Sequence, residues 1–157
     1  MVGVSKMDPI THLLIERDIT RLILDLGRCL DTGNFEKHGK NFIDSGVLKL
    51  PFKTVIGTDE ITQHSSTNLG KFDAVYHTIT DIIINIDSQG NTAVARANVH
   101  ALHLFNKSEP SYFAEIGGYY NFELIRLESC WKFSSVELVK VWSSGNAPNI
   151  GVSSNTT

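Results

Sequence analysis

A change in hydrophobic period near residue 75 constrains the fold of this chain more than any other feature. Before it, apolar residues recur every three or four positions, which is typical of amphipathic helices. From Val75 onwards they alternate with polar residues, which is typical of half-buried strands. Such a sheet must bury one face against the preceding helices. The order predicts an α+β domain with a mainly antiparallel sheet.

The helices are indicated by their ends. Asp8 followed by Pro9 is an N-cap and first-turn pair, and Gly33 is placed to end the helix that they open. Asn34 can cap a second, shorter helix directly afterwards. Acidic residues in the first turn favour a third. The predicted helices span residues 8–33, 34–42 and 58–68.

The strands complete one domain. With 157 residues the chain has the length of a single compact unit, and we find neither a repeat nor a linker in it. We therefore treat residues 1–157 as one domain and expect the polar tail 147–157 to be flexible. The predicted strands span residues 47–52, 75–86, 92–105, 117–127 and 130–142.

Charge and composition exclude several classes of function. The chain has 14 basic and 17 acidic side chains, so it provides no basic field for nucleic acid. Its longest apolar run, residues 82–84, is far too short to cross a membrane. Cys29 and Cys130 lack CxxC spacing, and we expect two reduced thiols in the core. A cytoplasmic protein is predicted.

Two residues stand out chemically. Asp31 is a carboxylate at the end of a helix, where the dipole disfavours it, so another group should compensate its charge. It either bonds loop amides at the Gly33 turn or faces a cavity. His77 lies on a strand, and alternation places Asp81 and Ile83 on its face. A carboxylate beside this imidazole would make it a competent general base.

Five short segments carry a recognisable pattern. They are LDTGNFE at 30–36, GTDEI at 57–61, YHTITD at 76–81, GGYYNFELIR at 117–126 and VWSSGN at 141–146. Each segment alone is weakly specific, and together they extend over most of the chain. In this order and spacing they resemble the SnoaL-like branch of the nuclear-transport-factor-2-like superfamily.

The resemblance implies a cone in which the sheet and helices enclose a pocket, usually in a dimer. Relatives include scytalone dehydratase, bile-acid dehydratases and polyketide cyclases. We therefore expect a homodimer and a cofactor-independent lyase or isomerase acting on a small hydrophobic carbonyl or polyketide-like molecule. No metal is expected, because the candidate His and Asp ligands either point to opposite faces of a strand or lie too far apart along it.

The resemblance also implies roles for particular residues. Asp31 would orient His77 as the base, and His100 would complete a trio like that of scytalone dehydratase. His103 is its competitor, because odd spacing places the two on opposite faces of the sheet. Tyr120 matches a family tyrosine and could supply a hydroxyl. The expected ligand-binding residues are Leu26, Phe52, Tyr76, Leu102 and Phe122.

The sequence departs from the family pattern at two positions, and an alternative function remains open. A family tyrosine would fall near Leu26, and the last strand lacks the expected cation. The chain could instead be a non-catalytic pocket or assembly module, including the small subunit of a ring-hydroxylating dioxygenase. Contact between Asp31 and His77 at a cavity favours an enzyme. In that case His77→Ala and Asp31→Ala should abolish turnover at a nearly unchanged melting midpoint.

Overall fold

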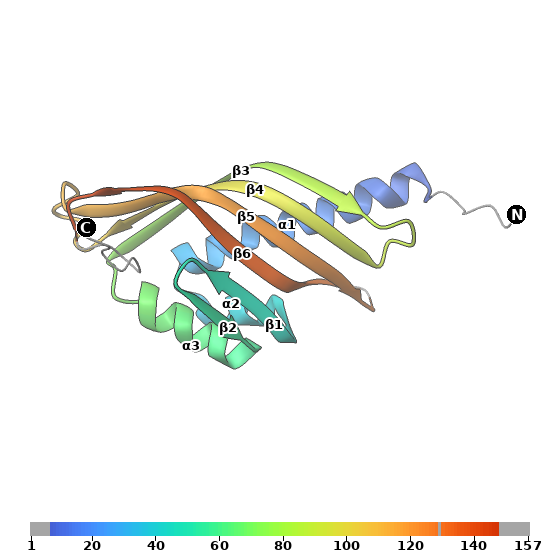
Figure 1. Ribbon diagram of the computed structural model, residues 1–157, viewed down its shortest axis with the longest axis horizontal. Coiled ribbons are helices and arrows are strands. Elements are labelled where there is room, and N and C mark those ends of the chain that lie inside the picture. Colours follow the sequence, from blue (N-terminus) through green and yellow to red (C-terminus); the bar gives the residue numbers. More distant parts are fainter. Residues whose placement is uncertain (1–6, 129, 148–157) are drawn as a thin grey trace, which may run out of the picture.

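The computed structural model describes residues 7–128 and 130–147. Figure 1 shows a curved sheet with α1 behind it and the remaining helices beside the short hairpin at one end. No helix among the described residues is long and apolar enough to cross a membrane. In chain order the elements are α1 (Pro9–Asp31), α2 (Phe35–Lys40), β1 (Phe42–Leu50), β2 (Lys53–Ile56), α3 (Thr58–Leu69), β3 (Ala74–Ile86), β4 (Thr92–Leu104), β5 (Phe113–Leu127) and β6 (Cys130–Gly145).

The three predicted helices are confirmed, and their caps account for the ends. The carboxylate of Asp8 accepts hydrogen bonds from the backbone N–H groups of Ile10 and Thr11, at 3.0 and 3.1 Å. Gly33 adopts a φ of 69° between α1 and α2, where a side chain would be strained. α2 is shorter than expected, because Phe42 already belongs to β1.

The six strands form one sheet in the order β2-β1-β6-β5-β4-β3. β1 runs parallel to β6, and the other neighbours are antiparallel, so the predicted mainly antiparallel sheet is confirmed. The sequence analysis missed β2, whose four residues are too few to show a clear alternation. β1 and β2 form a hairpin that extends the sheet over the helices α2 and α3 (Figure 1).

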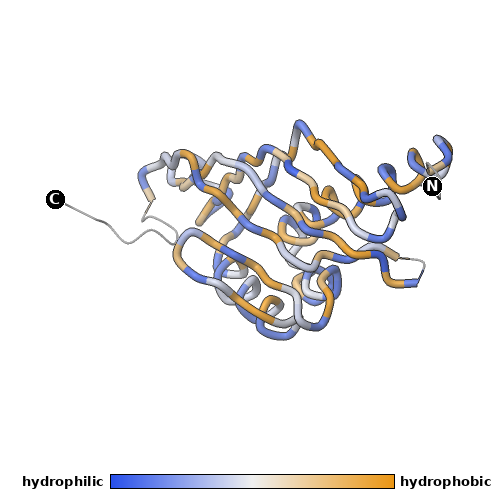
Figure 2. Tube along the Cα trace, turned by 45° about the vertical axis from the view of Figure 1, so that its right-hand side comes forward, coloured by the Kyte–Doolittle hydropathy of each residue, from blue (hydrophilic) through white to orange (hydrophobic). Residues whose placement is uncertain are grey.

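The long strands bury one face. On β4 the odd-numbered residues from Ala93 to His103 are buried, and the even-numbered ones point outward. Figure 2 shows the resulting alternation of hydrophobic and hydrophilic positions along the strands. Ile19 and Ile23 of α1 are fully buried in the same core as Phe133.

A bulge in β3 corrects the prediction that Asp81 and Ile83 share a face with His77. Asp81 has a φ of 53°, and the pairing with β4 shifts between Thr80 and Ile83. The extra residue reverses the alternation, so Ile83 is 65% exposed. Ile82 packs inward instead.

The surface corrects a second expectation. Cys29 is buried, but Cys130 is exposed, so only one of the two free thiols belongs to the core.

Tyr76, Val94 and Trp142 are large exposed apolar side chains. A homodimer stays a prediction. Beyond residue 147, the expected flexible tail lies outside the described residues.

Candidate active site

The side chains of Asp31 and His77 are in direct contact, although they are separated by 46 positions in the sequence. Asp31 Oδ1 lies 2.7 Å from His77 Nδ1. The two carboxylate oxygens also accept the backbone N–H of His77, at 3.0 and 3.1 Å. The carboxylate therefore fixes both the backbone and the ring of His77. The alternative in which Asp31 caps the Gly33 turn is not observed, because backbone bonds to Arg28, Cys29 and Leu30 satisfy that turn.

The contact follows from how α1 packs on β3. Gly27 and Asp31 are one helical turn apart and lie on the same face of α1. A Cβ atom on Gly27 would lie 3.3 Å from the Cβ of His77 and 3.0 Å from Ile79, so the glycine permits the close approach. β3 is an edge strand, and Asp31 pairs with a backbone donor on its open side.

His77 lines a cavity of about 130 Å³ between the sheet and the helices. Its side chain is only 5% exposed. Because Asp31 holds Nδ1, the hydrogen-bond pattern places the proton there and leaves Nε2 as the basic nitrogen. The wall is mainly apolar, and its members include Leu26, Leu30, Leu48, Leu50, Ile116, Val136 and Leu138.

His103, and not His100, lines the cavity together with His77. His103 is buried, its ring centroid lies 6.2 Å from that of His77, and its Nδ1 lies 3.3 Å from the carbonyl oxygen of Ala114. His100 points to the outer face, where its Nε2 is 2.7 Å from a carboxylate oxygen of Glu115. The prediction of His100 as a site residue is therefore corrected, since adjacent odd and even positions of β4 face opposite sides.

The expected ligand-binding residues divide into two groups. Leu26 and Phe52 line the cavity, Phe52 with half of its surface exposed. Tyr76 and Leu102 do not, because they pair across β3 and β4 on the outer face. Phe122 is also corrected, since it is 1% exposed and stacks on Phe133 within the core instead of lining the cavity.

Tyr120 and His103 line the cavity as neutral groups. Burial, and then the charge of Asp31, raises the pKa of Tyr120, so its phenol keeps the proton. Burial, and then His77, lowers the pKa of His103 to about 4. At neutral pH neither group carries charge. The Tyr120 hydroxyl can donate a hydrogen bond, whereas His103 directs its Nδ1–H to the Ala114 carbonyl and leaves Nε2 as an acceptor.

The low pKa of His103 predicts an acid-sensitive fold. The unfolded chain binds a proton at this site near pH 6.5, whereas the folded chain binds it only near pH 4. The free energy of unfolding should therefore fall as the pH decreases through this window, by up to about 3 kcal/mol for this one residue. Urea unfolding at pH 7 and pH 4.5 should show a smaller decrease for His103→Leu than for the wild type. Equal decreases would contradict the assignment.

The sequence analysis missed His38 and His64, which also line the cavity. His38 lies on α2 and is buried, whereas Phe42, four residues later, already belongs to β1. No local spacing marks His38, because its burial depends on the packing of α2 against other elements. His64 lies on α3 near the rim, with its ring centroid 6.3 Å from that of Phe52.

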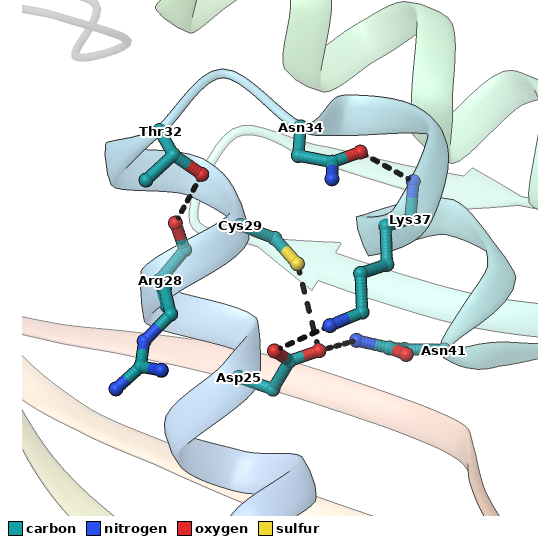
Figure 3. A network of polar contacts seen from close by, with 7 residues as sticks. All are labelled: Asp25, Arg28, Cys29, Thr32, Asn34, Lys37 and Asn41. Atoms are coloured by element: carbon teal, nitrogen blue, oxygen red, sulfur yellow. Dashed lines mark hydrogen bonds and ion pairs between the residues drawn. The ribbon is translucent and has the colours of Figure 1, made fainter.

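A polar network fixes α2 against α1 and so holds this wall in place (Figure 3). The carboxylate of Asp25 accepts hydrogen bonds from Lys37 Nζ at 2.7 Å and from Asn41 Nδ2 at 3.1 Å. The thiol of Cys29 approaches the same carboxylate at 3.6 Å. Burial alone would raise the pKa of Asp25, but the bonds from Lys37 and Asn41 outweigh it and lower the pKa.

Asp25→Asn should weaken this connection. A carboxylate whose folded pKa is lowered contributes stability above its unfolded pKa and loses it as the pH falls through the folded value. We expect a loss of about 1 kcal/mol in the free energy of unfolding at pH 7 that vanishes near pH 2. Denaturant unfolding of both proteins at the two pH values measures it. A loss that is the same at both would assign the effect to packing instead.

Within residues 7–128 and 130–147, no three His, Cys, Asp or Glu side chains are placed to hold a metal ion together. The cavity combines a carboxylate-held imidazole, a neutral tyrosine hydroxyl and mainly apolar walls. This set is suited to moving a proton on an uncharged molecule.

Comparison with known proteins identifies the family of the chain. Residues 11–137 match the SnoaL-like domain, and the chain belongs to that family. None of the curated proteins matches it significantly in sequence.

Solved structures show the same fold at low sequence identity. A provisionally assigned scytalone dehydratase from Novosphingobium aromaticivorans has 22% identity and a TM-score of 0.80, over 96% of this chain and 99% of that chain. The hexachlorocyclohexane dehydrochlorinase LinA-type3 from Novosphingobium barchaimii has 16% identity and a TM-score of 0.76, over 88% and 94%. An NTF2-like protein from N. aromaticivorans has 17% identity and a TM-score of 0.70, over 84% and 85%. The fold is thus the nuclear-transport-factor-2-like cone.

Proposed function

We propose that this protein is a cofactor-independent lyase or isomerase that removes a proton from a carbon atom of a small, uncharged, largely apolar molecule. The observation that carries the proposal is the 2.7 Å contact between Asp31 and His77, because it lies at the wall of an apolar cavity that His77 lines. Similarity to a dehydratase-like structure and to a dehydrochlorinase supports the class of reaction.

His77 acts as the base. Its Nε2 takes the proton from a carbon next to a carbonyl. The C–H electron pair forms a carbon–carbon double bond, and the π pair of the carbonyl moves onto its oxygen to give an enolate. Asp31 stabilises the imidazolium that results. Tyr120 donates a hydrogen bond to the enolate oxygen, and the mainly apolar cavity wall strengthens that bond.

The proton then leaves the imidazolium in one of two ways. It passes to a hydroxyl on the adjacent carbon, whose C–O bond breaks with release of water, and the product is an unsaturated carbonyl. Alternatively it returns to another carbon of the enolate, and the product is an isomer. Both routes balance without a redox partner.

The cavity wall defines the substrate class. Among the described residues that line it, none is Lys, Arg, Asp or Glu. A charged substrate would lose its hydration there without gaining an ion pair. The apolar walls instead favour an aromatic or alicyclic carbonyl compound. We therefore expect neutral ketones to bind more tightly than the corresponding carboxylates.

Hydrogen exchange tests the proposal without knowledge of the natural substrate. We would incubate the wild-type protein with 2-tetralone, a neutral enolisable ketone, in D₂O and follow loss of the α-proton signal by proton NMR. The expected result is exchange above the rate in buffer. Binding without exchange would favour the non-catalytic pocket protein, and neither binding nor exchange would contradict the proposed substrate class.

A further inference from the structure

The imidazole of His38 is a buried polar group that the proton-transfer mechanism does not use. It lies on α2, is 2% exposed and lines the same cavity as His77. Among the described residues its Nδ1 has no hydrogen-bond partner. Its ring meets that of Phe42 edge-on, with centroids 5.5 Å apart. It is therefore a buried polar side chain with one ring nitrogen left without a partner among the described residues.

An unpartnered buried polar group destabilises a fold, and such groups are rare in native proteins. His103 gives a matched comparison, since it is a buried histidine of the same cavity but its Nδ1 lies within bonding distance of the Ala114 carbonyl. A leucine could fill the position of His38 on the apolar face of α2 at lower cost. Because the ring of His38 lines the cavity, it can instead hydrogen-bond a molecule that enters there.

The position of His38 is fixed. Its neighbour Lys37 and the nearby Asn41 are both tied to Asp25 of α1, so α2 cannot easily turn the ring away from the cavity. Burial, and then the proximity of His77, lowers the pKa of His38 to about 4. The ring is thus neutral at physiological pH, with one nitrogen that donates and one that accepts.

We propose that His38 is a specificity-determining residue whose imidazole hydrogen-bonds an uncharged oxygen substituent of the substrate, separate from the group on which His77 acts. The inference rests on the proposed function and narrows it. The substrate is then a small neutral molecule with two oxygen functions, one at the proton-transfer site and a hydroxyl or carbonyl at His38. A hydrocarbon ketone with a single oxygen leaves His38 unpartnered and binds less tightly.

The first test needs no ligand. His38→Leu removes an unpartnered polar group at nearly constant volume, so its melting temperature should equal or exceed that of the wild type by up to about 4 °C. His103→Leu, the matched control, loses a bonded ring and should melt lower. If His38→Leu lowered the melting temperature as much as His103→Leu does, His38 would have a structural role and the inference would be wrong.

The second test measures binding of phenol and toluene. The two molecules have nearly the same shape, and phenol has a hydroxyl group where toluene has a methyl group. We expect the preference for phenol over toluene, as a ratio of Kd values, to be about tenfold larger in the wild type than in His38→Leu. His38→Gln, which keeps hydrogen-bonding capacity, should retain much of the preference. In the wild type, phenol should also shift the ring ¹⁵N resonances of His38.

The outcomes separate this inference from the proposed function. Phenol has no carbon-bound proton for His77 to remove by the proposed route, so the binding result does not depend on catalysis. An equal phenol preference in the wild type and His38→Leu, or no phenol binding by the wild type, would overturn the role of His38. If α-proton exchange were absent but the preference for phenol still depended on His38, only the catalytic proposal would be overturned.

Discussion

His77→Ala should reduce the rate of α-proton exchange in 2-tetralone by about 10²- to 10⁴-fold, the usual contribution of a positioned general base. Asp31→Asn should have an effect in the same range, because the amide no longer holds the proton on Nδ1 or stabilises the imidazolium. Proton NMR in D₂O at several enzyme concentrations measures both rates. The loss should appear mainly in kcat, since neither group is expected to dominate binding.

The structure corrects one expectation about these variants. Asp31→Ala was expected to leave the melting midpoint nearly unchanged, but Asp31 also accepts the backbone N–H of His77 on the edge strand β3. Alanine removes that acceptor as well, so its melting temperature should fall. Asn keeps one oxygen for the backbone bond. It is therefore the better substitution for separating chemistry from stability.

His100→Ala is the matched control for His77→Ala. It removes an imidazole that also contacts a carboxylate at 2.7 Å, but on the outer face of the sheet. Exchange should continue at the wild-type rate in this variant. If His100→Ala lost exchange while His77→Ala kept it, the assignment of the base would be reversed. Full exchange in both His77→Ala and Asp31→Asn would reject the mechanism.

Phe122→Ala should destabilise the fold by about 3–5 kcal/mol, because it leaves a cavity in the core. Phe122 is 1% exposed and packs between Tyr120 and Phe133, with ring centroids 5.5 and 5.4 Å away. Chemical denaturation at pH 7 measures the loss. Activity per folded molecule should change little, since the ring does not line the cavity.

Phe52→Ala is the comparison for that prediction. Phe52 lines the cavity with 51% of its surface exposed, so removing it should cost under about 1 kcal/mol of stability. Its effect should be on ligand binding at the rim. The two phenylalanines were indistinguishable in the sequence analysis, which placed both in the pocket. Comparable stability losses in the two variants would contradict their different positions.

Local sequence signals predicted much of the fold. The caps at Asp8 and Asn34 and the turn at Gly33 depend on neighbouring residues only, so the helix boundaries could be read with small errors. The alternation on β4 likewise identified the strand but not which face is buried. That is why His100 and His103 could not be told apart. Their environment depends on strands and helices far away in the chain.

The sequence alone determined the architecture, because helix caps and hydrophobic periods are local properties of a chain. Its short motifs indicated the family, and the resemblance implied the pair Asp31 and His77. Tertiary structure decided which side chains meet. The bulge at Asp81 reversed the inward and outward alternation of the residues that follow it on β3. The parallel pairing of β1 with β6 placed β1 in the sheet near α2 and α3. Burial of His38 beside the cavity follows from the packing of α2 on α1, a contact between surfaces that no local pattern encodes.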